Sequence, residues 1–229
     1  SSVCAALLHD VVEDCEVDVS DIETVFGDEV AFLVDGVTKL GKVNFASRED
    51  RQAESFRKML VAMARDIRVL LVKLADRLDN MRTLGHMSPG SQERIARETL
   101  EIYAPLAGRL GIQWLKAELE DLSFKHLEPE SFEILDRQVR GVAKNTDSDM
   151  SDVTSKLRKM LVTRGFSVEV SGRRKHRYSL HRNMTASGIG FEQVHAFVAF
   201  RVITESVADC YATLGVIHSE WTPIPGRFK

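Results

Sequence analysis

Apolar residues recur at helical spacing through the first 145 residues, and this periodicity constrains the fold of the 229-residue chain more than any other feature. Residues 67–73 are rich enough in β-branched side chains to form a buried strand, but the pattern continues to Leu84, which is too far for a typical strand. Ser20, Ser47 and Ser91 are predicted N-caps. The predicted helices cover residues 3–14, 21–26, 28–36, 48–65, 67–84, 91–108, 111–127 and 129–145.

Beyond a short polar stretch at 145–149, which we predict to be a linker, strand and helix patterns alternate. Such alternation indicates an α/β unit. The chain is therefore predicted to be mainly α, with an all-helical region followed by a partial α/β domain. The predicted elements of that domain are helices at 150–164, 175–184 and 206–219 and strands at 166–171 and 194–203.

The two parts of the chain differ in charge. The total of 31 Lys+Arg and 34 Asp+Glu gives a net charge of −3. Residues 1–152 carry 19 basic and 29 acidic side chains (−10), whereas residues 153–229 carry 12 and 5 (+7). This asymmetry suggests two domains, the second suited to an anionic ligand. A hydrophobic content of 44% excludes a disordered or fibrous chain.

The sequence also favours an intracellular protein. No apolar run approaches the roughly 18 residues that a membrane span needs, and the first residues lack the basic leader of a signal peptide. Three scattered cysteines, Cys4, Cys15 and Cys210, argue against a disulfide framework and favour a reducing compartment. The chain opens inside an apolar helical run, so we expect further residues before Ser1.

His9, Asp10, Glu13 and Asp14 form the most informative cluster. At helical spacing they would place an imidazole and three carboxylates on one face of a helix. Carboxylates this close repel one another unless a cation lies among them, and a divalent metal with nitrogen and oxygen ligands would relieve that cost. A helix whose solvated face is simply acidic explains the spacing about equally well.

A second polar face lies on a later predicted helix, where Asp76, Asn80 and Thr83 follow one another at i, i+4 and i+7. Asp76 stands among leucines, where an unpaired carboxylate is costly. We therefore expect Asp76 to bind a metal or to pair with a neighbouring charge, for which Arg77 and Arg82 are available.

Residues 172–182 are strongly basic and would surround a polyphosphate with guanidinium and ammonium groups. A nucleic-acid patch is an alternative, but Tyr178 is the only aromatic residue interleaved with these cations. A solvated basic helix face is a further alternative.

These motifs, in this order, resemble those of the RelA/SpoT homologue family, whose hydrolase belongs to the HD phosphohydrolase superfamily. That family makes and degrades guanosine 3′,5′-bis(diphosphate), ppGpp, and its pentaphosphate relative, pppGpp. The resemblance covers essentially the whole chain. It is carried by AALLHDVVED (5–14), LVDGVTKL (33–40), RQAE (51–54), KLADRL (73–78), NMRTL (80–84), ETLEIYAPL (98–106), ELEDL (118–122), GRRK (172–175) and PIPGRFK (223–229).

The resemblance implies three regions. We expect an HD-type hydrolase domain at 1–88, a connecting helical bundle at 89–148 and a truncated synthetase-like domain at 149–229. The hydrolase would remove the 3′-pyrophosphate of ppGpp or pppGpp in a reaction that depends on manganese.

For the hydrolase site, the resemblance implies a role for each matching residue. Manganese would lower the pKa of a bound water, an acidic pair would orient that water and handle protons, and hydroxide would attack the 3′-pyrophosphate, giving pyrophosphate and GDP or GTP. The family takes one more histidine ligand from a helix upstream of Ser1. The matching residues are His9, Asp10 and Asp76 for the metal, Glu13 and Asp14 for the acidic pair, and Asn80, Thr83 and Arg77 for the nucleotide, with Arg77 as likely to brace Asp76.

The synthetase-like domain keeps the family's nucleotide cradle at Arg173, Lys175, Ser179 and Lys229 but departs from it at the metal. Family members carry a magnesium-binding aspartate where this chain has Ala196, and a methyl group cannot hold a cation. We therefore expect the synthetase to be inactive, and Mg²⁺ to matter only if it were active.

Two alternatives to this hydrolase stay open. One is an HD phosphohydrolase that acts on another nucleotide, and the other is a non-catalytic regulator that binds guanine nucleotides. The expected partners are ppGpp, pppGpp, GDP and GTP, with no membrane and no direct nucleic-acid binding. A bacterial cytoplasm is the expected location, and a plastid is the alternative.

Overall fold

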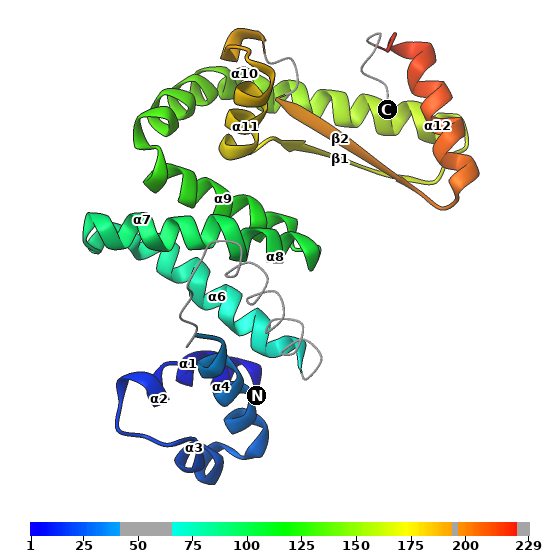
Figure 1. Cartoon of the computed structure of the whole chain (residues 1–229). Coiled ribbons are helices and arrows are strands. Elements are labelled where there is room, and N and C mark those ends of the chain that lie inside the picture. The colour runs from blue at the N-terminus through cyan, green and yellow to red at the C-terminus, as the bar shows by residue number, and fades with distance from the viewer. Residues whose placement is uncertain (42–65, 194–196, 224–229) are drawn as a thin grey trace. The chain divides into compact units, whose positions relative to one another are not determined.

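The structure is a computed structural model, and its contacts divide the chain into two compact units, Ser1–Pro129 and Glu130–Lys229 (Figure 1). The predicted helix at 48–65 and its predicted cap Ser47 lie outside the part of the chain that the structure describes. The described residues are 1–41, 66–193 and 197–223.

Every regular element described in the first unit is a helix, as the apolar periodicity predicts. The segment 67–73 belongs to a long helix and not to a strand, which confirms that interpretation. In chain order the elements are α1 (Ser2–Leu8), α2 (Val11–Asp14), α3 (Val19–Phe26), α4 (Asp28–Gly41), α6 (Ile67–Thr83), the 3₁₀ turn η1 (Leu84–His86), α7 (Pro89–Glu98), the π-helical turn η2 (Thr99–Tyr103), α8 (Ala104–Arg109) and α9 (Gln113–Leu127).

Two helices begin before their predicted serine caps. The N-cap of α3 is Asp18, in a capping box with Asp21, and the N-cap of α7 is Ser88. Ser20 and Ser91 therefore lie inside their helices, and both predicted caps are wrong. Aspartate satisfies the free N–H groups of a first turn as well as serine does, so composition alone does not choose between neighbouring candidates.

The predicted helix at 3–14 is interrupted where its polar residues begin. His9 and Asp10 form a turn between α1 and α2, and Asp10 is the N-cap of α2. The carbonyl of Asp10 still accepts hydrogen bonds from the N–H groups of Glu13 (2.9 Å) and Asp14 (2.8 Å). The four polar side chains are thus not presented by one continuous helix, which corrects the prediction.

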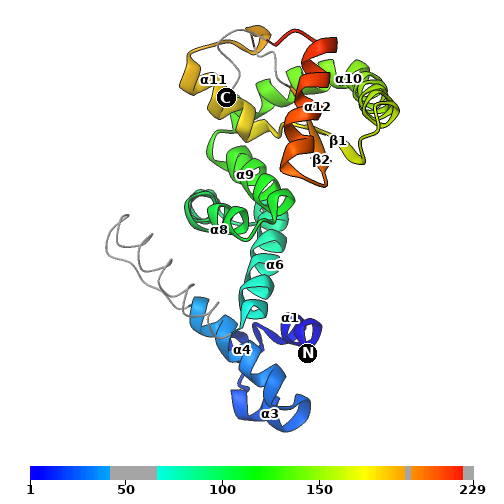
Figure 2. The same cartoon turned by 90° about the vertical axis from the view of Figure 1, so that its right-hand side faces the viewer.

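Helix α6 is shared by both core clusters of the first unit. Figure 2 shows α1 and α4 near one end of α6 and α8 and α9 near its other end, and α6 contacts α1, α4 and α9. Because opposite sides of one helix are buried, its polar residues are held at a fixed place between the clusters. The buried side chains of α6 are Leu70, Leu74, Leu78 and Met81 in the cluster with α7, α8 and α9, and Val69 and Val72 in the cluster with α1, α3 and α4.

Gly36 lets α4 approach α6 closely. A Cβ atom at this position would lie 2.8 Å from Cγ2 of Val69, which is buried on α6. Any larger residue would push the two helices apart, because buried backbone and side chains cannot yield by that amount without loss of packing.

The second unit combines a long helix with a small sheet. Strands β1 and β2 pair antiparallel, with Val168 opposite Thr204 and Arg174 opposite Val198. Leu157, Leu161 and Val170 form its buried core between helix and sheet. The elements are α10 (Pro129–Thr163), β1 (Val168–Arg174), α11 (Arg177–Ser187), η3 (Phe191–Gln193), β2 (Val198–Thr204) and α12 (Val207–Glu220).

The predicted linker at 145–149 is wrong as a break in the backbone, because α10 continues through it as one helix of 35 residues. Asn, Asp and Ser favour turns locally, but this stretch contains neither Gly nor Pro to stop a helix already formed on both sides. The prediction of a mainly α chain with a small strand-containing part near the C-terminus is confirmed. Among the described residues, no helix is both long and apolar enough to cross a membrane.

The two-sided burial of α6 predicts a large stability difference between two leucines of this helix. Leu74 is 1% exposed and Leu71 is 42% exposed. We expect Leu74→Ala to lower the free energy of unfolding by about 2–5 kcal/mol, because it leaves a cavity in the core. The matched change Leu71→Ala should cost about 1 kcal/mol or less. Chemical denaturation would measure both, and equal effects would contradict the packing described.

Candidate metal centre and adjoining cleft

The turn after α1 and the middle of α6 bring three predicted metal ligands together. Nε2 of His9 lies 2.9 Å from Oδ2 of Asp10 and 3.3 Å from Oδ1 of Asp76. One ligand atom from each residue lies within 4.8 Å of the others. Residues 67 positions apart in sequence therefore form one group with a nitrogen and two carboxylate donors.

The imidazole of His9 is oriented so that Nε2 faces the carboxylates. Its Nδ1 lies 2.8 Å from the carbonyl oxygen of Ala6, which can only accept, so Nδ1 carries a proton. Nε2 is buried, and among the described residues it has no hydrogen-bond partner, despite its short distance to Asp10. A ring held this way has a lone pair available for a metal ion, which is the usual arrangement of a histidine ligand.

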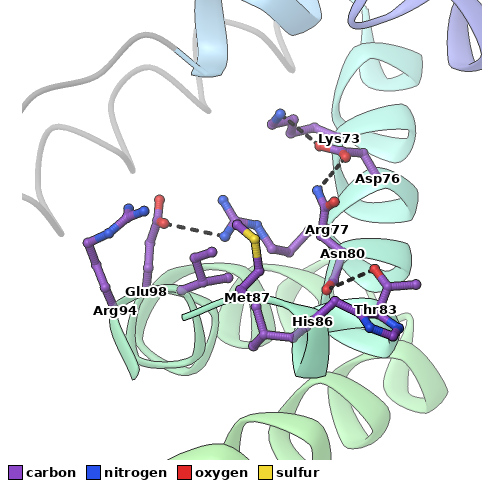
Figure 3. Close-up of a pocket in the computed structure, with 11 residues that line it drawn as sticks. Lys73, Asp76, Arg77, Asn80, Thr83, His86, Met87, Arg94 and Glu98 are labelled. Carbon is purple, nitrogen blue, oxygen red and sulfur yellow. Dashed lines mark hydrogen bonds and ion pairs between the residues drawn. The ribbon is translucent and has the colours of Figure 1, made fainter. Parts of the chain in front are cut away.

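Asp76 has a buried carboxylate, only 9% exposed, with partners on both oxygens. Oδ2 lies 2.7 Å from Nζ of Lys73 on the preceding turn, and Oδ1 accepts a hydrogen bond of 2.6 Å from Nδ2 of Asn80 on the following turn (Figure 3). These two contacts offset the free-energy cost of burying the carboxylate charge of Asp76. Asp76 is thus paired with Lys73, and not with Arg77 or Arg82 as the sequence suggested, and it also lies beside His9.

The three donors fit a divalent cation. A set of imidazole nitrogen and carboxylate oxygen ligands suits manganese, iron or zinc. The cation would bind the lone pair of His9 Nε2, which has no hydrogen-bond partner among the described residues, and would reduce the repulsion between the two carboxylates. Glu13 and Asp14, the predicted acidic pair, lie on α2, are exposed and are not members of this group. They follow Asp10 by about one helical turn, since both backbone N–H groups bond to its carbonyl.

A cleft of about 480 Å³ adjoins the group and shares Asp76 with it. Asn80, Thr83 and Arg77, the predicted nucleotide contacts, all line this cleft, so the structure brings them together with Asp76 (Figure 3). Thr83 donates its hydroxyl hydrogen to the carbonyl of Asp79 (3.0 Å), which leaves its oxygen able to accept.

Arg77 lines the cleft with a mostly buried side chain that contacts two neighbouring elements. Its guanidinium lies over the ring of Tyr103, 4.2 Å from the centroid, and NH1 is 3.3 Å from Oε2 of Glu98. Burial lowers the pKa of Arg77, but the electrostatic effects of Tyr103 and Glu98 outweigh burial, and the pKa is raised above its ordinary value. Arg77 therefore stays charged and ties α6 to η2 and α7.

Sequence reasoning missed four ionisable residues that line the cleft. Lys73 could have been found from its i, i+3 spacing to Asp76, which is a standard helical ion pair. His86, Arg94 and Glu98 carry no such signal, because they come from η1 and α7 and reach the cleft only through the packing of these elements against α6.

The predicted synthetase cradle is only partly within the described residues. Arg173 lies on β1, and Ser179 lies on α11. Lys175 lies between them, and its backbone N–H donates to the carbonyl of Phe197 at 2.9 Å. Ala196 and Lys229 lie outside the described residues, so the departure at the magnesium position stays a prediction from sequence.

Two families match the chain in the order expected. Residues 1–113 match the HD domain, and residues 172–229 match the region found in RelA / SpoT proteins. The chain belongs to the RelA/SpoT family.

Relatives within this family align along the whole chain. A protein of Myxococcus xanthus named GTP pyrophosphokinase is 50% identical over 100% of this chain and 31% of its own length. A probable guanosine-3′,5′-bis(diphosphate) 3′-pyrophosphohydrolase of Synechocystis is 50% identical over 99% of this chain and 30% of its own length. The bifunctional (p)ppGpp synthase/hydrolase SpoT of Escherichia coli K12 is 46% identical over 100% of this chain and 32% of its own length. The chain thus spans about a third of the length of these relatives.

The geometry of this RelA/SpoT chain predicts that Asp76 is needed for metal binding. In the full-length protein we expect Asp76→Asn to weaken Mn²⁺ binding at least about tenfold, because one anionic donor is lost. Asp79→Asn, an exposed position on the same helix, is the matched control and should leave the affinity unchanged. Titration of free Mn²⁺ by electron paramagnetic resonance measures both, and equal affinities in the two variants would refute the assignment.

Proposed function

We propose that this chain carries a metal-dependent hydrolase that removes the 3′-pyrophosphate of ppGpp and pppGpp. The observation that supports this most is the meeting of His9, Asp10 and Asp76, with a buried orphaned nitrogen, at the edge of a cleft. Several relatives are named as guanosine-3′,5′-bis(diphosphate) 3′-pyrophosphohydrolases, which supports the choice of substrate. We place the protein in a bacterial cytoplasm.

The side chains that line the cleft suit a polyphosphorylated nucleotide. Lys73, Arg77 and Arg94 supply positive charge, and Asn80 and Thr83 supply neutral hydrogen-bonding groups. The cations lie in the same cleft as Asp76, so a pyrophosphate bound near Asp76 would be neutralised from several sides. Neutral donors and acceptors are what a ribose or a base requires.

His9, Asp10 and Asp76 would hold the metal, which we propose to be manganese. When bound, the metal supplies Lewis-acid activation of water and of phosphate oxygens. Glu13 and Asp14 would orient the attacking water and take its proton. Oxygen from water bonds to the phosphorus attached to the ribose 3′ oxygen, that P–O bond breaks, and the 3′ oxygen ends as a hydroxyl group. The products are pyrophosphate and GDP or GTP.

The acidic pair is tested by isosteric changes in the full-length protein with Mn²⁺. We expect Glu13→Gln and Asp14→Asn each to lower kcat for ppGpp by about 100-fold or more, because proton transfer is lost. Glu16→Gln, an exposed position just after α2, is the control and should retain activity. The measurement is release of labelled pyrophosphate, with Mn²⁺ affinity measured in parallel to show that the metal group is intact.

The same assay separates the competing functions. Release of inorganic phosphate, or preference for another nucleotide, would favour a different HD phosphohydrolase. Tight binding of ppGpp without turnover, with Mn²⁺ present, would favour a non-catalytic regulator. Either result would overturn the proposed reaction.

We further propose that the synthetase-like region is degenerate, because Ala196 stands where the family carries a magnesium-binding aspartate. Phosphoryl transfer depends on a metal to neutralise developing charge. The full-length protein with Mg²⁺, ATP and GDP should therefore form no ppGpp above background in a radiolabel assay. Robust synthesis would show that another group holds the metal, and the proposal would fail.

A further inference from the structure

The side-chain amide of Gln92 joins three segments of the first unit. Its Nε2 donates to the carbonyl of Met87 at 2.8 Å and to the carbonyl of Gly85 at 3.3 Å. Its Oε1 lies 3.1 Å from Nδ1 of His126 near the end of α9. One residue of α7 thus contacts both the turn after α6 and the far end of α9.

The chemistry of the partners determines which way this amide points. Both backbone carbonyls can only accept hydrogen bonds, so the NH₂ group must face them and Oε1 must face His126. His126 then donates from Nδ1. Burial and the neighbouring charge of Lys125 lower the pKa of His126, which favours the neutral ring with its single proton on that nitrogen.

The turn that Gln92 holds is a wall of the cleft. Leu84, His86 and Met87 all line the cleft, and Gly85 lies between them. Met87 N–H also bonds to Leu84 O at 3.0 Å, which closes the turn on itself but does not anchor it to a neighbouring helix. The two bonds from Gln92 supply that anchor, because they tie the turn to α7, whose residues Arg94, Ile95 and Glu98 line the same cleft.

We propose that Gln92 is a positioning residue, which sets the width of the cleft between η1 and α7 and so determines how tightly the nucleotide is bound. His126 supports it by fixing the orientation of the amide. This inference rests on the proposed function of the cleft. Gln92 is not among the residues that line the cleft or form the metal group, so it acts through the turn and not through the reacting atoms.

Two variants of the full-length protein test the inference. Gln92→Leu removes both hydrogen bonds, and Gln92→Glu keeps the shape but turns an acceptor toward two carbonyls. We expect each to raise KM for ppGpp about tenfold, the equivalent of one or two lost hydrogen bonds. kcat and Mn²⁺ affinity should change less than about twofold, because the metal group is untouched.

Gln113→Leu is the matched control, because Gln113 also donates its amide to a backbone carbonyl, that of Gly108 at 3.2 Å, and does not line the cleft. It should leave KM unchanged. A residue that only fills space would tolerate Gln92→Glu, so wild-type KM in that variant would overturn the inference. Parallel losses of kcat, metal binding and melting temperature would overturn it too, since they mark a general structural role.

The failure of the inference can be told apart from the failure of the proposed function. If the wild-type protein binds ppGpp without turnover, the hydrolase proposal fails, and the Kd from calorimetry replaces KM in the same comparison. An unchanged Kd in both Gln92 variants then refutes the positioning role. If the wild-type protein neither binds nor hydrolyses ppGpp, both proposals fall together.

Discussion

The rest of the site depends on the ion pair and the hydrogen bond that stabilise the carboxylate of Asp76 inside the protein. A carboxylate that is 9% exposed would be strongly destabilising without partners, and here Lys73 and Asn80 supply them, while His9 lies beside Oδ1. The same arrangement directs one oxygen toward the imidazole and the other toward an ammonium group. Charge compensation therefore also prepares the position for a cation and places a positive side chain at the start of the cleft.

That arrangement is stable only because α6 is packed on two sides. Its leucines belong to the cluster with α7, α8 and α9, while Val69 and Val72 belong to the cluster with the N-terminal helices. Gly36 allows the close contact on the second side. The polar residues of α6 are consequently held where the turn at His9 on one side and the cleft on the other can both reach them.

Much of the fold could be predicted from the sequence, because apolar periodicity reports burial directly. Apolar periodicity does not, however, reveal short breaks within a helical segment. The turn at His9–Asp10 keeps nearly helical backbone angles, so the spacing of side chains hardly changes across it. The stretch 145–149 led to the opposite error. Its polar residues favour turns and predicted a break, but they lie within one long helix.

The sequence by itself determined the family to which the chain belongs, the residue types of the proposed site and the helix that carries Asp76, Asn80 and Thr83. Spacing along one helix is enough to relate Asp76 to Asn80, and it would also have related Asp76 to Lys73. The packing of the helices brings His9 to Asp76, as the family resemblance implies, and it alone decided that Arg77 lies against Tyr103 and Glu98 and that Gln92 bonds to one wall of the cleft. The physical reason is that a helix relates only residues within about two turns of one another, whereas longer-range contacts depend on how helices pack.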